Sequence, residues 1–258
     1  MYYFKVMKVV ILAGGRGTRL TEETSLKPKP LVEAGGKPLI WHIMQNYSLH
    51  GFTEFIILTG YKGQQIREYF ANFWLHQADL TFDLASSKQE IHSLRGPNWK
   101  VTVLDTGIDT NTGGRISRLK NLLKEDFLVT YGDGVSDVDI SSLIAKHNEL
   151  KACVTLTAVQ PLARFGALNL EMDKVTNFEE KPKGDGAWVN GGFFVFSPEV
   201  FEYLSSGSAS LEFDILPKIA RDGKLGAFKH SGFWQPVDTI RDLHRLEEAI
   251  EKGALPWT

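Results

Sequence analysis

Short apolar runs alternate with amphipathic stretches through the first half of the chain. Such short runs are typical of buried strands, and they predict strands at Val6–Leu12, Phe55–Thr59, Val101–Leu104 and Phe127–Tyr131. The stretches between and after them predict helices at Leu39–His50, Gln64–Phe73, Arg115–Lys124 and Ile140–Asn148. This alternation favours right-handed crossovers onto a largely parallel sheet with helices on both faces.

From about Ala152 the pattern changes to strands separated by turns rich in proline and glycine. It predicts strands at Cys153–Val159, Ala167–Glu171 and Gly192–Phe196, and helices at Pro198–Leu204, Leu211–Arg221 and Thr239–Lys252. The two halves are not separated by a low-complexity linker. We therefore predict a single domain over residues 1–258, with one continuous sheet and a small C-terminal subregion.

Composition narrows the class of protein only slightly. The chain of 258 residues is 43% hydrophobic and 23% charged, as in ordinary globular domains. A formal net charge of −2 gives no electrostatic reason to expect nucleic acid or a membrane as partner. The single Cys153 lies in an apolar run, which predicts a buried thiol in a reducing compartment. With no signal peptide visible and no apolar run of roughly 18 residues, we expect a cytoplasmic location.

A glycine-rich segment, Leu12–Leu20, follows the first predicted strand and precedes Lys27-Pro28-Lys29-Pro30. Its glycines let backbone N–H groups approach an anion. Four cations crowd within fourteen residues and would repel one another unless solvated or matched by an anion; they are Arg16, Arg19, Lys27 and Lys29. The segment is neither a dinucleotide fingerprint nor a P-loop. It predicts a triphosphate-binding loop, with a plain exposed basic loop as the alternative.

Two aspartates are candidate metal ligands. Asp133 lies between two glycines after the predicted strand at Phe127–Tyr131, and Asp238 directly precedes the last predicted helix. Mg²⁺ typically takes one or two protein carboxylates together with phosphate oxygens. The alternatives are an ordinary turn residue for Asp133 and a helix N-cap for Asp238. Asp137 and Asp139 instead suit the start of a helix. Together with the basic loop, these acids predict metal-assisted phosphoryl chemistry.

Three other polar segments are candidate ligand contacts. One runs from Asp105 to Arg115, the second covers Glu179–Lys183, and the third is Asn190–Gly192. The alternatives are a surface loop, a solvated run of charges and a simple turn into a strand. The seven histidines and one cysteine show no zinc-binding spacing. A serine nucleophile elbow is also absent from the sequence, which argues against acyl transfer.

Taken together, these motifs resemble the sugar-1-phosphate nucleotidyltransferases over Met7 to Trp257. The glycine-rich segment with its Lys-Pro-Lys-Pro partner is specific for that family. Further strings are similar to its cytidylyl branch: Lys37–Met44, Gly60–Gly63, Arg67–Asn72, Thr112–Arg115, Tyr131–Gly134, Arg164–Leu168 and Gly232–Pro236. The resemblance implies an α/β fold that is Rossmann-like and GT-A-like. In such a fold a mixed, mostly parallel sheet is flanked by helices. About residues 7–150 would bind nucleotide and about 151–258 the sugar phosphate.

The implied reaction joins CTP and α-D-glucose 1-phosphate into CDP-glucose and releases pyrophosphate, with Mg²⁺ as cofactor. By resemblance, the catalytic residues are Arg19, toward the β- and γ-phosphates, and Lys29, toward the α-phosphate. Asp133 and Asp238 would hold the metal. The implied nucleotide contacts are Leu12, Ala13, Gly14, Gly15, Arg16, Gly17, Thr18, Arg19, Lys29, Thr110, Gly114, Arg115 and Gly132. The implied sugar-phosphate contacts are Gly166, Glu180, Lys181, Asn190, Gly191 and Trp234.

The resemblance also implies a role in making dideoxysugars of the cell surface and a homo-oligomer, for which a hexamer is one candidate size. The aromatic segment Tyr69–Leu75 is either an interface or a core helix. Base selection has its own argument: a guanidinium fork can donate to adjacent acceptors such as N3 and O2 of cytosine, and uracil lacks the N3 acceptor. We therefore predict that Arg115 reads the base, and that Arg115→Ala lowers use of CTP far more than it disturbs folding.

The segment Ser210–Pro217 differs from the string expected in the cytidylyl branch and is more similar to other branches of the family. An alternative is thus a nucleotidyltransferase for dTTP, UTP or GTP, or for another hexose or heptose 1-phosphate. A second alternative is a non-catalytic nucleotide-sugar-binding subunit. The presence of Lys29, Asp133 and Asp238 favours an enzyme, because a binding subunit has less need of both acids.

Overall fold

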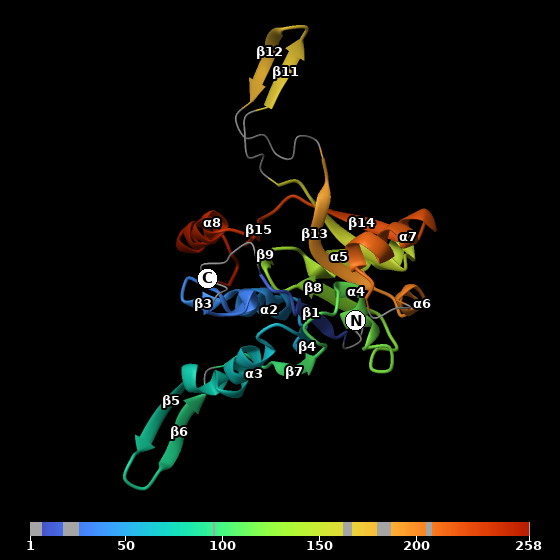
Figure 1. Cartoon of the computed structure of the whole chain (residues 1–258). Coiled ribbons are helices and arrows are strands. Elements are labelled where there is room, and N and C mark those ends of the chain that lie inside the picture. Colours follow the sequence, from blue (N-terminus) through green and yellow to red (C-terminus); the bar gives the residue numbers. More distant parts are fainter. Residues whose placement is uncertain are drawn as a thin grey trace.

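A central mixed sheet organises the molecule. The computed structural model describes residues 7–17, 26–94, 96–161, 167–179, 187–204 and 208–257. Within these residues, a seven-stranded sheet has the order β14–β10–β13–β8–β1–β4–β7 (Figure 1). Its strands are β1 (Val9–Ala13), β4 (Glu54–Thr59), β7 (Lys100–Asp105), β8 (Phe127–Tyr131), β10 (Val154–Val159), β13 (Val189–Phe196) and β14 (Leu225–His230).

The sheet is parallel except at one strand. β1 pairs in parallel with β4 and β8, β4 with β7, and β10 with β14. β13 lies between β8 and β10 and runs antiparallel to both. The predicted fold class, mixed and mostly parallel, is confirmed. The sheet takes strands from both halves of the chain.

Helices cover both faces of the sheet. They are η1 (Lys29–Leu31), α2 (Leu39–Leu49), α3 (Gly63–Ala71), η2 (Phe73–His76), α4 (Thr112–Ser117), α5 (Ile140–Leu150), α6 (Val200–Tyr203), a π-helix (Leu211–Ile215), α7 (Leu216–Arg221) and α8 (Ile240–Glu251). Side chains alternate across β1: Val9 and Ile11 join a core with α2, α5 and α8, whereas Val10 and Leu12 join a second core with α4, α6 and α7. Because both faces of β1 are buried, its sequence is a continuous apolar run.

Short two-stranded elements complete the described fold. They are β2 (Glu33–Ala34) with β3 (Lys37–Pro38), β5 (Ala78–Asp83) with β6 (Lys88–Leu94), β9 (Gly134–Ser136) with β15 (Trp234–Pro236), and β11 (Ala167–Glu171) with β12 (Lys174–Glu179). The β5–β6 and β11–β12 hairpins extend away from the body (Figure 1). The sequence analysis did not anticipate the β5–β6 hairpin, although apolar and polar residues alternate along Leu80–Phe82.

Two predicted helices differ from those observed. The helix predicted at Arg115–Lys124 begins at Thr112 and ends at Ser117. The first turn of this helix packs closely against Ala209. Gly113 allows this contact, since a Cβ there would lie 2.7 Å from the carbonyl oxygen of Ala209. The helix predicted at Leu211–Arg221 begins as a π-helix, in which Ile215 donates its N–H to the Ser210 carbonyl at 3.2 Å.

Two further expectations concern single segments. Cys153 is 1% exposed, as predicted for a buried thiol. In the aromatic segment, Tyr69 and Phe70 pack against the core, and the ring centroid of Phe73 lies 5.7 Å from that of Trp99.

In the part of the chain that the structure describes, no helix is long and apolar enough to cross a membrane.

Candidate active site

A cavity of about 600 Å³ lies where β1 and β8 end. The two strand ends are tied together, because the N–H of Gly132 donates to the Leu12 carbonyl at 3.0 Å. Loops after parallel strands meet at this edge of the sheet. The predicted site residues that line the cavity are Leu12, Ala13, Gly14, Gly15, Lys29, Thr110, Arg115, Gly132, Asp133, Asn190, Gly191, Trp234 and Asp238.

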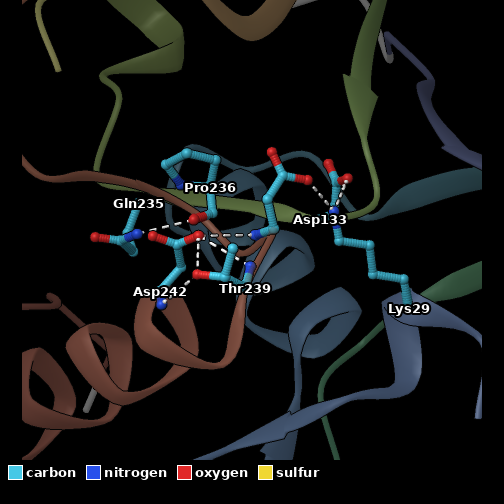
Figure 2. A network of polar contacts seen from close by, with 7 residues as sticks. Lys29, Asp133, Gln235, Pro236, Thr239 and Asp242 are labelled. Carbon is cyan, nitrogen blue, oxygen red and sulfur yellow. Dashed lines mark hydrogen bonds and ion pairs between the residues drawn. The ribbon is translucent and has the colours of Figure 1, made fainter. Parts of the chain in front are cut away.

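Lys29 joins the two predicted metal ligands. Its ammonium lies 2.7 Å from Oδ2 of Asp133 and 2.7 Å from Oδ1 of Asp238 (Figure 2). The Lys29 side chain is 10% exposed, whereas those of Asp133 and Asp238 are 37% and 35% exposed. Burial by itself lowers the pKa of Lys29, but the two carboxylates outweigh it and the pKa is raised. Two carboxylates, far apart in sequence, therefore converge on one cationic atom at the cavity wall.

Local structure sets the position of each group in this triad. Lys29 begins η1 after Pro28, which is extended with φ −65° and ψ 144°. Asp133 and Asp238 are brought together because β9 pairs with β15 and the N–H of Val237 donates to the Asp133 carbonyl at 3.0 Å.

The N-cap alternative for Asp238 is wrong. Thr239 caps α8, and it forms a capping box with Asp242 (Figure 2). The Thr239 hydroxyl donates to the Asp242 carboxylate at 2.8 Å, and the N–H of Asp242 donates back to that hydroxyl at 3.2 Å. Since the neighbouring residue satisfies the helix terminus, the Asp238 carboxylate turns to Lys29 instead.

The triad is a plausible cation site on its own geometry. Mg²⁺ needs few protein carboxylates when phosphates and water supply its other ligands, and here the Lys29 ammonium occupies the position between two carboxylates. In the described part of the chain, no group of three or more metal-ligating side chains occurs. Asp133 and Asp238 thus fit a metal bound together with a polyphosphate better than a metal held by protein alone.

Arg115, which also lines the cavity, connects α4 to three other segments of the chain. It is 4% exposed, and burial lowers its pKa. Its Nη1 donates to Thr59 O at 2.9 Å, to Thr106 Oγ1 at 2.5 Å and to Gly107 O at 2.8 Å, and its Nη2 donates to Gly14 O at 3.0 Å. A Cβ on Gly14 would overlap this guanidinium. Gly14 is therefore small because Arg115 packs against it.

These contacts change one expectation. A buried guanidinium with four protein acceptors is a structural part of the site, so Arg115→Ala should disturb folding, contrary to the sequence-based expectation. The reading of cytosine by Arg115 stays a prediction. Thr110 lies nearby and donates its hydroxyl to Thr106 O at 2.5 Å.

Two of the crowded cations have carboxylate partners at the protein surface. Arg16 pairs with Asp109 at 2.9 Å, and Lys27 pairs with Glu33 at 2.7 Å. Protein carboxylates therefore match these two charges, and a phosphate-binding role for Arg16 stays a prediction. Neither Arg16, Gly17 nor Gly114 lines the cavity; the N–H of Gly114 donates to Ala209 O at 3.1 Å. Thr18, Arg19, Gly166, Glu180 and Lys181 lie outside the described residues.

The predicted sugar side is built on β13 and β15. The Trp234 indole N–H donates to Gly191 O at 2.8 Å, and Oδ1 of Asn190 accepts from Gly192 N at 2.9 Å. Asn111, Thr112 and Gly192, which lie in the predicted contact segments, also line the cavity. Sequence reasoning missed the other lining residues: Pro30, Tyr131, Gly134, Glu212 and Pro236. Most neighbour a predicted residue, but Glu212 lies in the segment noted only for its unusual sequence.

A parallel-edge cavity with an adjoining lysine–carboxylate triad suits transfer of a phosphoryl-linked group. A family model described as nucleotidyl transferase matches residues 8–253, and the chain belongs to this family. The glucose-1-phosphate cytidylyltransferases of Salmonella typhi and Salmonella typhimurium are each 53% identical to it over 253 residues, which is 97% of this chain and 98% of each relative. The solved structure of HddC from Yersinia pseudotuberculosis is similar with a TM-score of 0.70 and 25% identity, covering 95% of this chain and 99% of that one.

Proposed function

We propose that this chain is a glucose-1-phosphate cytidylyltransferase, which makes CDP-glucose and pyrophosphate from CTP and α-D-glucose 1-phosphate. The observation that carries the proposal is the 53% identity to two enzymes of that name over nearly the whole length of both partners. The match covers 97% of this chain and 98% of each relative, which favours this activity over the alternatives with another nucleotide or sugar.

The reaction is an in-line displacement at phosphorus. A phosphate oxygen of the sugar 1-phosphate forms a bond to the α-phosphorus of CTP, and the bond from that phosphorus to the bridging oxygen of pyrophosphate breaks. Catalysis of this kind depends on positioning and on stabilising the charge of the transferring group. We propose that Lys29 contacts the α-phosphate and that Arg19 holds the β- and γ-phosphates. Gly14 and Gly15 border the cavity, and we propose that they contact the nucleotide.

A divalent metal is part of the proposal. Nucleotidyltransferases of this family generally use one, and we propose Mg²⁺ held by Asp133 and Asp238. When bound, the metal would neutralise charge on the phosphates and on the leaving pyrophosphate. Asp133 and Asp238 also hold the Lys29 ammonium, so Lys29 lies beside the position proposed for the metal.

We propose that the sugar 1-phosphate binds along β13 and β15. Asn190, Gly191 and Trp234 border this part of the cavity, and we assign them to the sugar phosphate, with Gly166, Glu180 and Lys181 as predicted contacts. The Gly191 carbonyl accepts from the Trp234 indole, so the wall that would face the sugar is fixed before substrate enters.

A pyrophosphate-release assay tests the function. Five nucleoside triphosphates, including CTP, UTP, dTTP and GTP, are each combined with several sugar 1-phosphates. We expect the highest kcat/KM for CTP with glucose 1-phosphate; preference for another pair would overturn the assignment, and no release with any pair would favour a binding subunit. Asp133→Asn should abolish release, whereas Asp139→Asn should not, because Asp139 caps α5 and asparagine caps equally well.

Assembly and location extend the proposal. We propose a cytoplasmic homo-oligomer that serves synthesis of cell-surface sugars. The β5–β6 hairpin is a candidate contact between copies, because Phe82, Leu84 and Ile91 are 54%, 89% and 52% exposed there and a two-stranded hairpin has little stability of its own. Light scattering after size-exclusion chromatography should show a smaller species for Leu84→Asp than for Met172→Asp on the other hairpin.

A further inference from the structure

Glu212 reaches the cavity from the segment whose sequence departs from the expected family pattern. It lies in the π-helix Leu211–Ile215, whose end residues Leu211 and Ile215 are buried in the second core. Phe213, which lies between them in the same helix, is instead 87% exposed to solvent. Because the buried residues anchor the helix, the Glu212 side chain is directed to the cavity wall, which it lines.

Three hydroxyl groups hold the Glu212 carboxylate. Tyr131 donates to Oε1 at 2.6 Å, while Thr112 and Ser210 each donate to Oε2 at 2.8 Å. Tyr131 is itself partly buried against the second core, and its hydroxyl oxygen accepts from Nδ2 of Asn190 at 3.4 Å. A carboxylate can accept about four hydrogen bonds. These contacts fix its orientation and leave capacity for one more donor.

The position of Glu212 limits the kind of group that it can meet. It joins Thr112, on the side proposed for the nucleotide, to Tyr131 and Asn190, on the side proposed for the sugar. A carboxylate repels phosphate, and the Lys29 ammonium pairs with Asp133 and Asp238. The neutral, hydroxyl-bearing parts of the substrates are the groups that a fixed acceptor would attract.

We infer that Glu212 is a specificity-determining residue that accepts a hydrogen bond from a substrate hydroxyl. The hydroxyl belongs either to the ribose of CTP or to the hexose of the sugar phosphate, and both offer the same chemistry. This inference rests on the proposed function, since it assumes these two substrates. A site built around a hydroxyl rejects the analogue that lacks it, because the acceptor is then left without its donor.

Deoxy analogues identify the hydroxyl. For the wild type, kcat/KM is measured with 2′-deoxy-CTP and 3′-deoxy-CTP, and with the monodeoxy derivatives of glucose 1-phosphate. We expect one analogue to be worse than its parent by about 10- to 100-fold, the range of a hydrogen bond to a charged acceptor. In Glu212→Gln, that ratio should shrink toward one while ratios for the other analogues stay unchanged. A ribose analogue would assign the contact to CTP, and a hexose analogue would assign it to the sugar.

Two outcomes would overturn the inference: unchanged ratios for every analogue in Glu212→Gln, or an equal loss with all substrates, as a purely structural residue would give. Asp214→Asn is the matched control, since it neutralises an exposed acid of the same helix and keeps an acceptor oxygen for the Ser210 N–H. Should Glu212→Gln fail to fold, Glu212→Asp retains the charge and retracts it by one methylene, and the same ratio should fall partway.

The proposed function is tested separately by pyrophosphate release from the wild type. If the wild type releases none with CTP and glucose 1-phosphate, calorimetric binding of CTP, its deoxy analogues and the sugar phosphates replaces turnover. The ratios of their dissociation constants then test Glu212 alone.

Discussion

Lys29 offers the sharpest test of the proposed site, because its replacement should change metal binding and turnover in opposite directions. In Lys29→Met the ammonium between Asp133 and Asp238 is removed while most of the buried side-chain volume remains. The wild-type ammonium competes with a divalent cation for the same two carboxylates. Without nucleotide, the variant should therefore bind Mn²⁺ or Mg²⁺ more tightly than the wild type, and it should lose turnover because the proposed contact with the α-phosphate would be removed.

The size of this effect follows from the geometry. Two unit charges 2.7 Å apart attract by roughly 6 kcal/mol at an effective dielectric constant of 20. Desolvation of the buried ammonium opposes this attraction, and both carboxylates keep about a third of their surface exposed. A net contribution of about 1–3 kcal/mol is a reasonable value for such charged hydrogen bonds. Removing the competitor should then lower the dissociation constant for the metal by about 5- to 150-fold.

Titration of nucleotide-free protein with Mn²⁺, followed by the electron paramagnetic resonance of the free ion, measures this change. Lys27→Met is the matched control, because it removes a neighbouring cation whose partner is the exposed Glu33; its affinity for Mn²⁺ should equal that of the wild type. Mg²⁺ should also raise the Tm of Lys29→Met more than that of the wild type, since it replaces the missing positive charge. Equal or weaker Mn²⁺ binding by Lys29→Met would refute the reasoning.

Three further predictions concern buried groups outside the triad. Arg115→Lys cannot reach its four acceptors with one ammonium, so urea unfolding should show a loss of at least about 2 kcal/mol, and an unchanged midpoint would contradict the role assigned here. Burial lowers the pKa of His42 and His147, so the unfolded chain binds protons first as pH falls below about 6.5. Stability should be full above that pH and decline below it, and His147→Gln should flatten the pH dependence of Tm. Burial raises the pKa of Cys153 to about 11, so a disulfide reagent at pH 8 should label it in urea but not in the native protein.

Local patterns were enough to predict every strand of the main sheet except β14. The apolar runs that form β1, β4, β8 and β10 are recognisable because both faces of these strands are buried, whereas the edge strand β7 is only partly buried and keeps alternating apolar positions. The direction of β13 was not predictable, since antiparallel pairing with β8 and β10 depends on the path of the chain between them and not on local composition. The β5–β6 hairpin was missed because its strands are exposed and carry a weak alternating pattern.

The candidate site, too, was predictable from the sequence only in part. Gly14, Lys29 and Asp133 stand out in the sequence because each belongs to a short motif beside a predicted strand or between prolines. The partners of these residues lie far along the chain, and only folding brings them together. Lys29 contacts Asp238 across 209 positions, and Arg115 reaches the Gly14 carbonyl across 101.

The class of fold, the family resemblance and the candidate residues for phosphate and metal follow from the sequence alone. Which of these residues lie together depends on the folded chain. It placed the Asp238 carboxylate beside Lys29 rather than at the helix terminus, because Thr239 and Asp242 already cap α8. It gave the Arg115 guanidinium to backbone carbonyls, and it brought Glu212 to the cavity wall. Each of these outcomes depends on hydrogen-bond partners that no local pattern can specify, since they come from separate strands and loops.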